Sequence, residues 1–187
     1  MLHEILSFVI NTVTGLLAGF LLLRFWMQVQ RVRPPVALAQ AIFQLTDWIV
    51  HPIRRIVPGF RGYDWASLIA VFLAAFLSMA LDFWLFSRLP FVAIAVMSLF
   101  RVIQWIVYGL MALLILEAIF SWVNPHAPFA PFIRALNEPV LLPLRKILPP
   151  FGGLDFSPMV ALILLQVMNR VMASLQDEVL SKVVFFS

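Results

Sequence analysis

The sequence has no cysteine and little charge. Without cysteine, the 187-residue chain has no disulfide, no thiolate metal ligand and no cysteine nucleophile. Charged residues make up only 12% of it and hydrophobic residues 63%, whereas a water-soluble domain is typically about one quarter charged. The composition therefore excludes an ordinary soluble domain and favours a chain that crosses a membrane.

The motifs of enzymes and cofactor sites are also missing. There is no glycine-rich phosphate loop and no pair of histidines on one helix, and His3, His51 and His126 are scattered, so we expect no metal site and no cofactor. Asp64 and Asp155 precede two apolar runs at equivalent places, which suggests an intramembrane aspartyl protease as one hypothesis. Capping of a helix start accounts for each aspartate, so we predict that the protein is not an enzyme.

The chain is built around a stretch that occurs twice. Residues 51–64 align with residues 142–155 without a gap when one copy is shifted by 91 positions. A long apolar run follows each copy, which indicates a duplicated membrane unit. The matched positions are Pro52 and Pro143, Arg54 and Arg145, Arg55 and Lys146, Pro58 and Pro149, Phe60 and Phe151, Gly62 and Gly153, and Asp64 and Asp155.

Apolar runs long enough to cross a bilayer as helices lie at about 5–28, 65–86, 98–123 and 156–179, with Phe91 as an alternative start for the third. We therefore predict an all-α membrane protein with four transmembrane helices in two tandem two-helix repeats, residues 1–90 and 91–187. Ser157 and Pro158 fit an N-cap followed by a first-turn proline. All the expected capping and turn residues are Pro58, Gly62, Asp64, Gly152, Gly153, Asp155, Ser157 and Pro158.

The segment between the two spans of each repeat is too polar to cross the membrane. In residues 36–57 polar residues recur at helical spacing opposite an apolar face, which is typical of an amphipathic helix lying in the membrane interface. A helix that covers the bundle is the alternative. Residues 129–148 form the second such segment. The expected polar stripe is Gln40, Gln44, Asp47 and His51, and the expected apolar face is Leu38, Ile42, Leu45 and Ile49.

Basic residues are concentrated in these two motif loops. By the positive-inside rule the loops are then cytoplasmic and both termini lie on the outer side. The basic side chains are expected to bind anionic phospholipid headgroups, at about 1 kcal/mol per residue near the surface, or to dock an acidic protein partner. We attribute the net charge of +4 to lipid contact rather than to nucleic acid. The residues concerned are Arg54, Arg55, Arg61, Arg145 and Lys146.

Polar residues inside the spans are expensive in hydrocarbon and normally have partners. Arg24 and Glu117 stand at nearly corresponding positions in the two repeats, and Asp82 and Arg170 both lie late in the second helix of a repeat, beside Asn169. Pseudo-symmetry therefore predicts two structural ion pairs, Arg24–Glu117 and Asp82–Arg170. Snorkelling at the interfaces and a polar pathway for an ion are the alternatives.

Several motifs resemble those of the YggT family of small bacterial membrane proteins. They are Leu-Arg-Phe-Trp-Met at 23–27, Pro-Ile-Arg-Arg-Ile-Val-Pro at 52–58, Phe-Ser-Trp-Val at 120–123, Pro-Leu-Arg-Lys-Ile-Leu-Pro at 143–149 and Gly-Gly-Leu-Asp-Phe-Ser-Pro-Met at 152–159. The resemblance covers nearly the whole chain in two repeats. Two positions depart from the family pattern: Arg61 stands before Gly62 where the second copy has Gly-Gly, and Lys146 replaces the usual second arginine.

The resemblance implies an integral protein of the bacterial inner membrane that is associated with osmotic or envelope stress through potassium uptake. In that membrane, the orientation given by the positive-inside rule places both termini in the periplasm. Plastid relatives with a single repeat are implicated in cofactor assembly on cytochrome b6 and in membrane organisation. No catalytic activity comes with the family. We therefore expect a non-enzymatic protein that acts through its basic loops on lipid, on a membrane-protein partner or on a second copy of itself. The alternative is an oligomeric potassium channel or transport component whose lumen is lined by Glu117, Asp82 or Asn169.

Overall fold

The fold is all-helical wherever the computed structural model describes it, in residues 1–59, 62–86, 91–124, 126–148 and 155–185. Helices long and apolar enough to cross a membrane account for most of this length, which confirms the predicted all-α membrane fold. These long helices are α1 (Leu2–Val29), α3 (Trp65–Phe86), α4 (Phe91–Val123) and α6 (Ser157–Phe185), and the shorter α2 (Val36–Ile56) and α5 (Ala130–Ile147) lie between the members of each pair.

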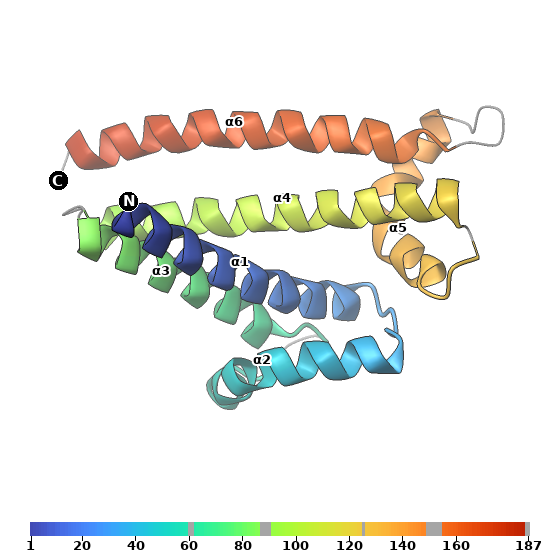
Figure 1. The fold of residues 1–187 in the computed structure, drawn as a ribbon, viewed down its shortest axis with the longest axis horizontal. Helices are drawn as coiled ribbons and strands as arrows, with labels where there is room; N and C mark the ends of the chain where they lie inside the picture. The colour runs from blue at the N-terminus through green and yellow to red at the C-terminus, as the bar shows by residue number, and fades with distance from the viewer. Residues whose placement is uncertain (60–61, 87–90, 125, 149–154, 186–187) are drawn as a thin grey trace.

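The long helices pack as two antiparallel hairpins. α1 packs against α3 and α4 against α6, while the contact of α3 with α4 joins the two repeats. Both termini lie at one end of the molecule, and α2 and α5 lie toward the other (Figure 1). α4 begins at Phe91 rather than near residue 98, and α6 continues beyond residue 179 to Phe185. The last turns of α6 carry an exposed i, i+4 ion pair between Glu178 and Lys182, at 2.6 Å, which supports this extension.

α1 ends in a Schellman motif with an unusual residue. The Arg31 N–H donates to the Gln28 carbonyl at 3.1 Å, and the Val32 N–H donates to the Met27 carbonyl at 3.0 Å. These two hydrogen bonds define the Schellman C-cap. Arg31 has φ 54°, the left-handed conformation that glycine adopts at no cost and that costs other residues about 1–2 kcal/mol. Pro34 follows shortly and prevents the helix from resuming.

α2 folds back along the second half of α1 (Figure 1). Ile42, Thr46 and Val50, spaced four apart, are buried in the bundle, so one stripe of α2 covers α1 and α3. Packing of one stripe on the bundle is compatible with both arrangements that the sequence left open. A position of α2 and α5 in the membrane interface stays a prediction.

The apolar residues of α2 do not all share the buried stripe. Ile42 is buried and Leu38 and Ile49 are partly buried, but Leu45 is 47% exposed, so only part of the predicted apolar face packs against the bundle. Leu45 instead lies on a second apolar side with Trp48, because these residues fall about 60° apart on the helical wheel. α2 thus has three sides: one against the bundle, one polar and one apolar and exposed.

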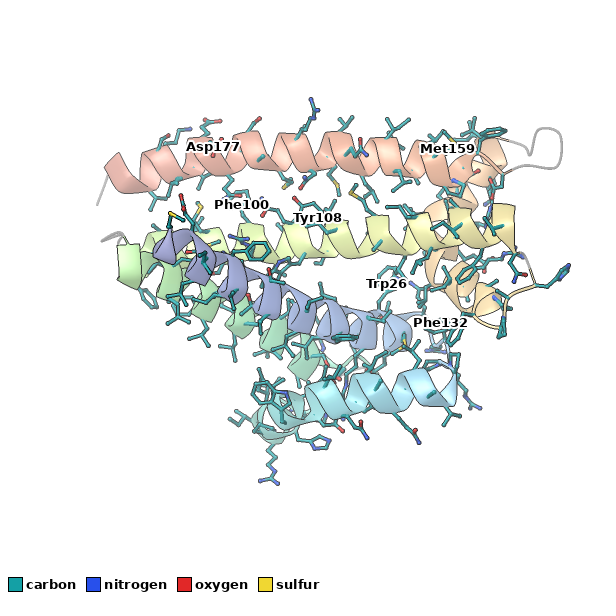
Figure 2. All side chains as sticks on the ribbon, viewed as in Figure 1. Trp26, Phe100, Tyr108, Phe132, Met159 and Asp177 are labelled. Atoms are coloured by element: carbon teal, nitrogen blue, oxygen red, sulfur yellow. The ribbon has the colours of Figure 1, made fainter. Side chains whose placement is uncertain are left out.

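α5 packs in the same register in the second repeat. Thr46 of α2 and Asn137 of α5, which are 91 positions apart, are both fully buried. The Asn137 side-chain amide donates to the carbonyl of Leu113 in α4 at 2.8 Å. The indole N–H of Trp26 donates to the Leu136 carbonyl at 2.9 Å, and Trp26 packs with Phe132 between α1 and α5 (Figure 2). α5 therefore joins the repeats at the loop end of the bundle.

Candidate functional site

The same ion pair closes the loop of each repeat. Arg54 in the last turn of α2 lies 2.5 Å from the carboxylate of Asp64, and Arg145 in the last turn of α5 lies 2.7 Å from that of Asp155. We call these two contacts the Arg–Asp pairs. Each ties the end of the short helix to the residues that start the following span, so the duplicated motif has the same geometry in both repeats.

A half-buried cluster surrounds the first pair, with Arg24 and Asp64 buried and Asp47 and Arg54 partly exposed. The Arg24 guanidinium, 7% exposed, donates to Asp47 at 2.6 Å and to the Thr46 hydroxyl at 2.7 Å, and its Nε lies 3.5 Å from Asp64. The first cluster is therefore Arg24, Asp47, Arg54 and Asp64, with two positive and two negative charges. Because the opposite charges balance, Arg24 and Asp64 can be buried beside hydrocarbon.

The second cluster is smaller and carries an excess of negative charge. Arg145 donates both to Asp155 and, through Nη2, to Glu117 of α4 at 2.7 Å. Burial raises the pKa of the Asp155 carboxyl, but the Ser157 N–H and the Arg145 guanidinium outweigh it and hold that pKa below its usual range. Burial likewise acts to lower the pKa of Arg145, yet its two carboxylate partners leave the pKa raised. The second cluster, Glu117, Arg145 and Asp155, is thus a guanidinium shared by two carboxylates.

These clusters correct the first predicted ion pair. Arg24 does not pair with Glu117: each finds its partner within its own repeat, Asp47 for Arg24 and Arg145 for Glu117. The physical reason is that α2 and α5 fold back onto the preceding span. A partner from the same repeat is thereby brought into contact, while the other repeat's charge stays remote.

The second predicted ion pair is also wrong. Asp82 accepts a hydrogen bond from the Asn11 side-chain amide at 3.1 Å and is attracted by Arg101 of α4. Arg170 is exposed on α6 and has no ion pair with any residue that the structure describes. The Asn169 amide donates weakly to the hydroxyl of Tyr108 in α4, at 3.4 Å, so it links α4 and α6.

The capping residues behave mainly as expected. Asp64 directly precedes α3 and accepts a hydrogen bond from the Ser67 hydroxyl at 2.7 Å, and Gly62 has φ 83°, which favours glycine. Asp155 accepts from the Ser157 N–H at 2.9 Å. Ser157 is the first residue of α6 rather than its N-cap, because the Phe156 carbonyl already accepts the first helical bonds.

The remaining predicted turn residues lie at helix ends or outside the described residues. Pro58 lies just after the end of α2, and Pro158 is the second residue of α6 and is buried. Arg61, Gly152 and Gly153 lie outside the described residues.

The predicted lipid-binding residues fall into two groups. Arg54 and Arg145 are engaged in the Arg–Asp pairs, whereas Arg55 and Lys146 are exposed and form no ion pair with a described residue. Each exposed cation is followed by a strongly exposed isoleucine, Ile56 at 83% and Ile147 at 76%. The duplicated dibasic motif therefore has one structural and one surface position in each repeat.

Sequence reasoning missed the roles of four residues. Asp47 appeared only as part of the α2 polar stripe, and Thr46 did not stand out. The shift of 91 positions places them opposite Glu138 and Asn137, and this recurrence of polar residues was the available signal. Arg31 and Arg33 were seen only as loop charges, but they line a cavity with Arg24 and Arg54.

Comparison with known proteins agrees with the duplicated geometry. The sequence model of the CCB3/YggT family matches residues 3–85 and again residues 96–176. No solved structure matches the chain.

Several bacterial proteins are similar over most of their length. An "Uncharacterized protein YggT" of Escherichia coli (strain K12) is 34% identical over 166 residues, covering 88% of this chain and 87% of the relative. "Uncharacterized protein PA0392" of Pseudomonas aeruginosa is 34% identical over 173 residues, covering 87% and 85%. An uncharacterized protein of Haemophilus influenzae is 29% identical over 167 residues, covering 89% and 90%. With two matches to the family model and these full-length relatives, the chain belongs to the CCB3/YggT family.

Proposed function

We propose that the protein is a non-enzymatic membrane component that binds anionic phospholipids through the loop end of its helical bundle. The observation that carries the proposal is a repeated surface pair, Arg55–Ile56 and Lys146–Ile147, in which an exposed cation without an ion pair to any described residue precedes an exposed isoleucine. A basic side chain beside an apolar one suits the boundary between headgroups and acyl chains, where each cation contributes about 1 kcal/mol of attraction to anionic lipid.

The Arg–Asp pairs support this role by fixing the ends of α2 and α5. Arg54 and Arg145 hold each helix end against the following span, so that Arg55 and Lys146 project at defined places rather than from mobile loops. Pre-positioned cations lose less conformational freedom on contacting a headgroup than flexible ones do.

The cellular setting is proposed on the same basis. With the basic loops cytoplasmic and both termini periplasmic, the surface would face the anionic cytoplasmic leaflet of the inner membrane. We propose that binding there contributes to the response to osmotic or envelope stress. An acidic protein or a second copy of this chain docking on the same cations is the alternative outcome of the test below.

Charge reversal tests the proposal. R55E, K146E and the double variant should insert normally, because neither residue pairs with a described residue, but should lose enrichment of anionic lipid in nanodiscs of mixed phosphatidylglycerol and phosphatidylcholine. They should also fail to restore growth under osmotic stress in a strain lacking the protein. K182E, which reverses a charge in the last turns of α6, is the control. Full enrichment and full complementation by the double variant would remove the hypothesis.

The rival function is a potassium channel or transport component, and one observation supports it. The second cluster has two carboxylates for one guanidinium, and Glu117 Oε2 is buried with no partner among the described residues. However, Glu117 lies about 24 Å along α4 from Arg101, the neighbour of Asp82. One chain therefore does not bring these carboxylates together, and a pore would need an oligomer.

Potassium flux into proteoliposomes under an imposed gradient separates the two functions. A channel should give flux above empty vesicles that loses cation selectivity in E117Q. Absence of flux from correctly inserted protein would leave the lipid-binding function alone.

A further inference from the structure

A cavity of about 610 Å³ opens beside the end of α1, at the loop end of the first repeat. Its volume falls within the range of small-molecule binding sites. The side chains around it are of two kinds. The charged and polar ones are Arg24, Gln28, Arg31, Arg33, Arg54, Tyr63 and Asp64, and the apolar ones include Met27, Val29, Val32, Pro34 and Phe43.

The cavity has an excess of positive charge. Four guanidiniums and one carboxylate line it, and Asp64, the carboxylate, is already shared by Arg24 and Arg54. Counting Asp47, which pairs with Arg24 from outside the lining, the region keeps a formal charge of +2. Arg31 and Arg33 are exposed and have no ion pair with any residue in the described ranges, so they supply this excess.

The backbone at Arg31 is strained. Arg31 occupies the left-handed position of the α1 C-cap, with φ 54°, where glycine would be free of strain. Strained positions of this kind tend to occur where a side chain serves a ligand. The C-cap also sets Arg31 and Arg33 on the turn that borders the cavity.

The ligand's chemistry follows from the two kinds of lining. Guanidinium groups bind phosphate oxygens bidentately and keep their charge at any physiological pH. The apolar side includes Val32 and Phe43. A small inorganic ion would make no apolar contact with these residues, whereas the glycerol and upper acyl part of a lipid would pack against them. We propose that the cavity holds the phosphate headgroup of one anionic phospholipid, with Arg31 and Arg33 as its principal ligands.

The two arginines proposed as ligands have no counterpart in the corresponding connection of the second repeat. The connection after α1, residues 30–35, reads Gln-Arg-Val-Arg-Pro-Pro, whereas the connection after α4, residues 124–129, reads Asn-Pro-His-Ala-Pro-Phe and contains neither arginine nor lysine. The inference rests on the proposed lipid binding but adds a stoichiometry: one retained lipid per chain, in addition to the diffuse enrichment produced by Arg55 and Lys146.

Native mass spectrometry of protein extracted from membranes containing phosphatidylglycerol and phosphatidylcholine tests the site. The wild type should retain one phosphatidylglycerol per chain, and R31G/R33Q should retain at least tenfold less. R134Q/K182Q removes the same number of charges from outside the cavity and should retain the lipid. Because glycine relieves the strain at position 31, thermal unfolding of R31G/R33Q should show an intact fold. Retention of phosphatidylglycerol by R31G/R33Q at the wild-type level would overturn the site.

Two further arms separate the remaining outcomes. Ten millimolar inorganic phosphate should not displace the lipid from the wild type, and displacement would overturn the lipid assignment in favour of a soluble phosphate. If the wild type retains no phosphatidylglycerol but still enriches it in nanodiscs through Arg55 and Lys146, the cavity proposal fails and the proposed function stands. If both retention and enrichment are absent, the proposed function fails as well.

Discussion

Arg145 donates at once to two carboxylates from different helical segments, with 2.7 Å separating its guanidinium from Glu117 and again from Asp155. Glu117 comes from α4 and Asp155 from the turn before α6, so one side chain of α5 ties both spans of the second repeat together. In the first repeat the shared group is the carboxylate: Asp64 is bound by both Arg24 and Arg54. The two repeats thus use the same Arg–Asp pair within different networks: the first cluster is neutral, and the second has one carboxylate more than it has guanidiniums.

Removing Arg145 should destabilise the second repeat, because Glu117 and Asp155 both bind its guanidinium. R145A leaves Glu117, which is 4% exposed, without its cation, and should lower the free energy of unfolding by about 1–3 kcal/mol. Adding E117Q should recover much of the loss, since no unpaired buried charge then remains. Unfolding in detergent measures both variants, with R134A as a control for loss of an exposed α5 arginine. A double variant no more stable than R145A would contradict the pairing.

The two motif aspartates should differ in importance. The Asp64 side chain is 2% exposed and serves Arg24, Arg54 and Ser67, whereas that of Asp155 is 21% exposed. We expect D64A to cost about 2–4 kcal/mol, because it removes a buried carboxylate that binds Arg24, Arg54 and Ser67 together. We expect D155A to cost about 1 kcal/mol, the typical value of a helix cap. Thermal unfolding of the two variants side by side provides the measurement. Equal losses would show that burial does not set the difference.

Asp155 should make the free energy of unfolding depend on pH, with lower stability in acid. Its folded-state pKa lies below the ordinary value of 3.8, so the folded protein binds the proton less readily than the unfolded chain. The stability that this carboxylate contributes is therefore fully present above the unfolded pKa and is lost as the pH falls through the folded one. Unfolding measured from pH 6 down to pH 3 should decline less steeply in D155N than in the wild type. Parallel declines would exclude this contribution.

Arg31 should carry a cost in stability. R31G relieves a left-handed backbone and should raise the free energy of unfolding by about 1 kcal/mol. R33G is the matched control: Arg33 is not among the residues with positive φ, and glycine there should be neutral or destabilising. Chemical unfolding of the two variants in the same detergent is the measurement. A less stable R31G would mean that the side chain contributes packing that outweighs the strain.

The absence of cysteine makes the topology easy to test. Single cysteines at Gly59, after α2, and at Ser181, near the end of α6, can be introduced without removing native thiols. An impermeant maleimide added to intact cells should label position 181 and spare position 59 until the membrane is opened. The reverse labelling pattern would indicate a cytoplasmic C-terminus and contradict the predicted orientation.

The sequence by itself determined the fold class, because hydrophobic run length and the shift of 91 positions depend only on residue order. The Arg–Asp pairs were also within reach, since Arg54 and Asp64 recur at the same spacing as Arg145 and Asp155. Periodicity located the α2 helix and its apolar face, but it did not show which part of that face packs against the bundle: Ile42 is buried and Leu45 is exposed. A helix packed against two others buries a narrower stripe than a simple polar and apolar division suggests.

The tertiary structure alone decided which charges meet. Arg24 looked equivalent to Glu117, yet its partners come from α2 and from the start of α3, because α2 folds back on α1 and brings Asp47 within 2.6 Å. The cavity lined by Arg31 and Arg33 arises in the same way, from a turn, a helix and a loop separated along the chain. Coulomb energy depends on distance and burial, and neither is a property of residue order until the helices have packed.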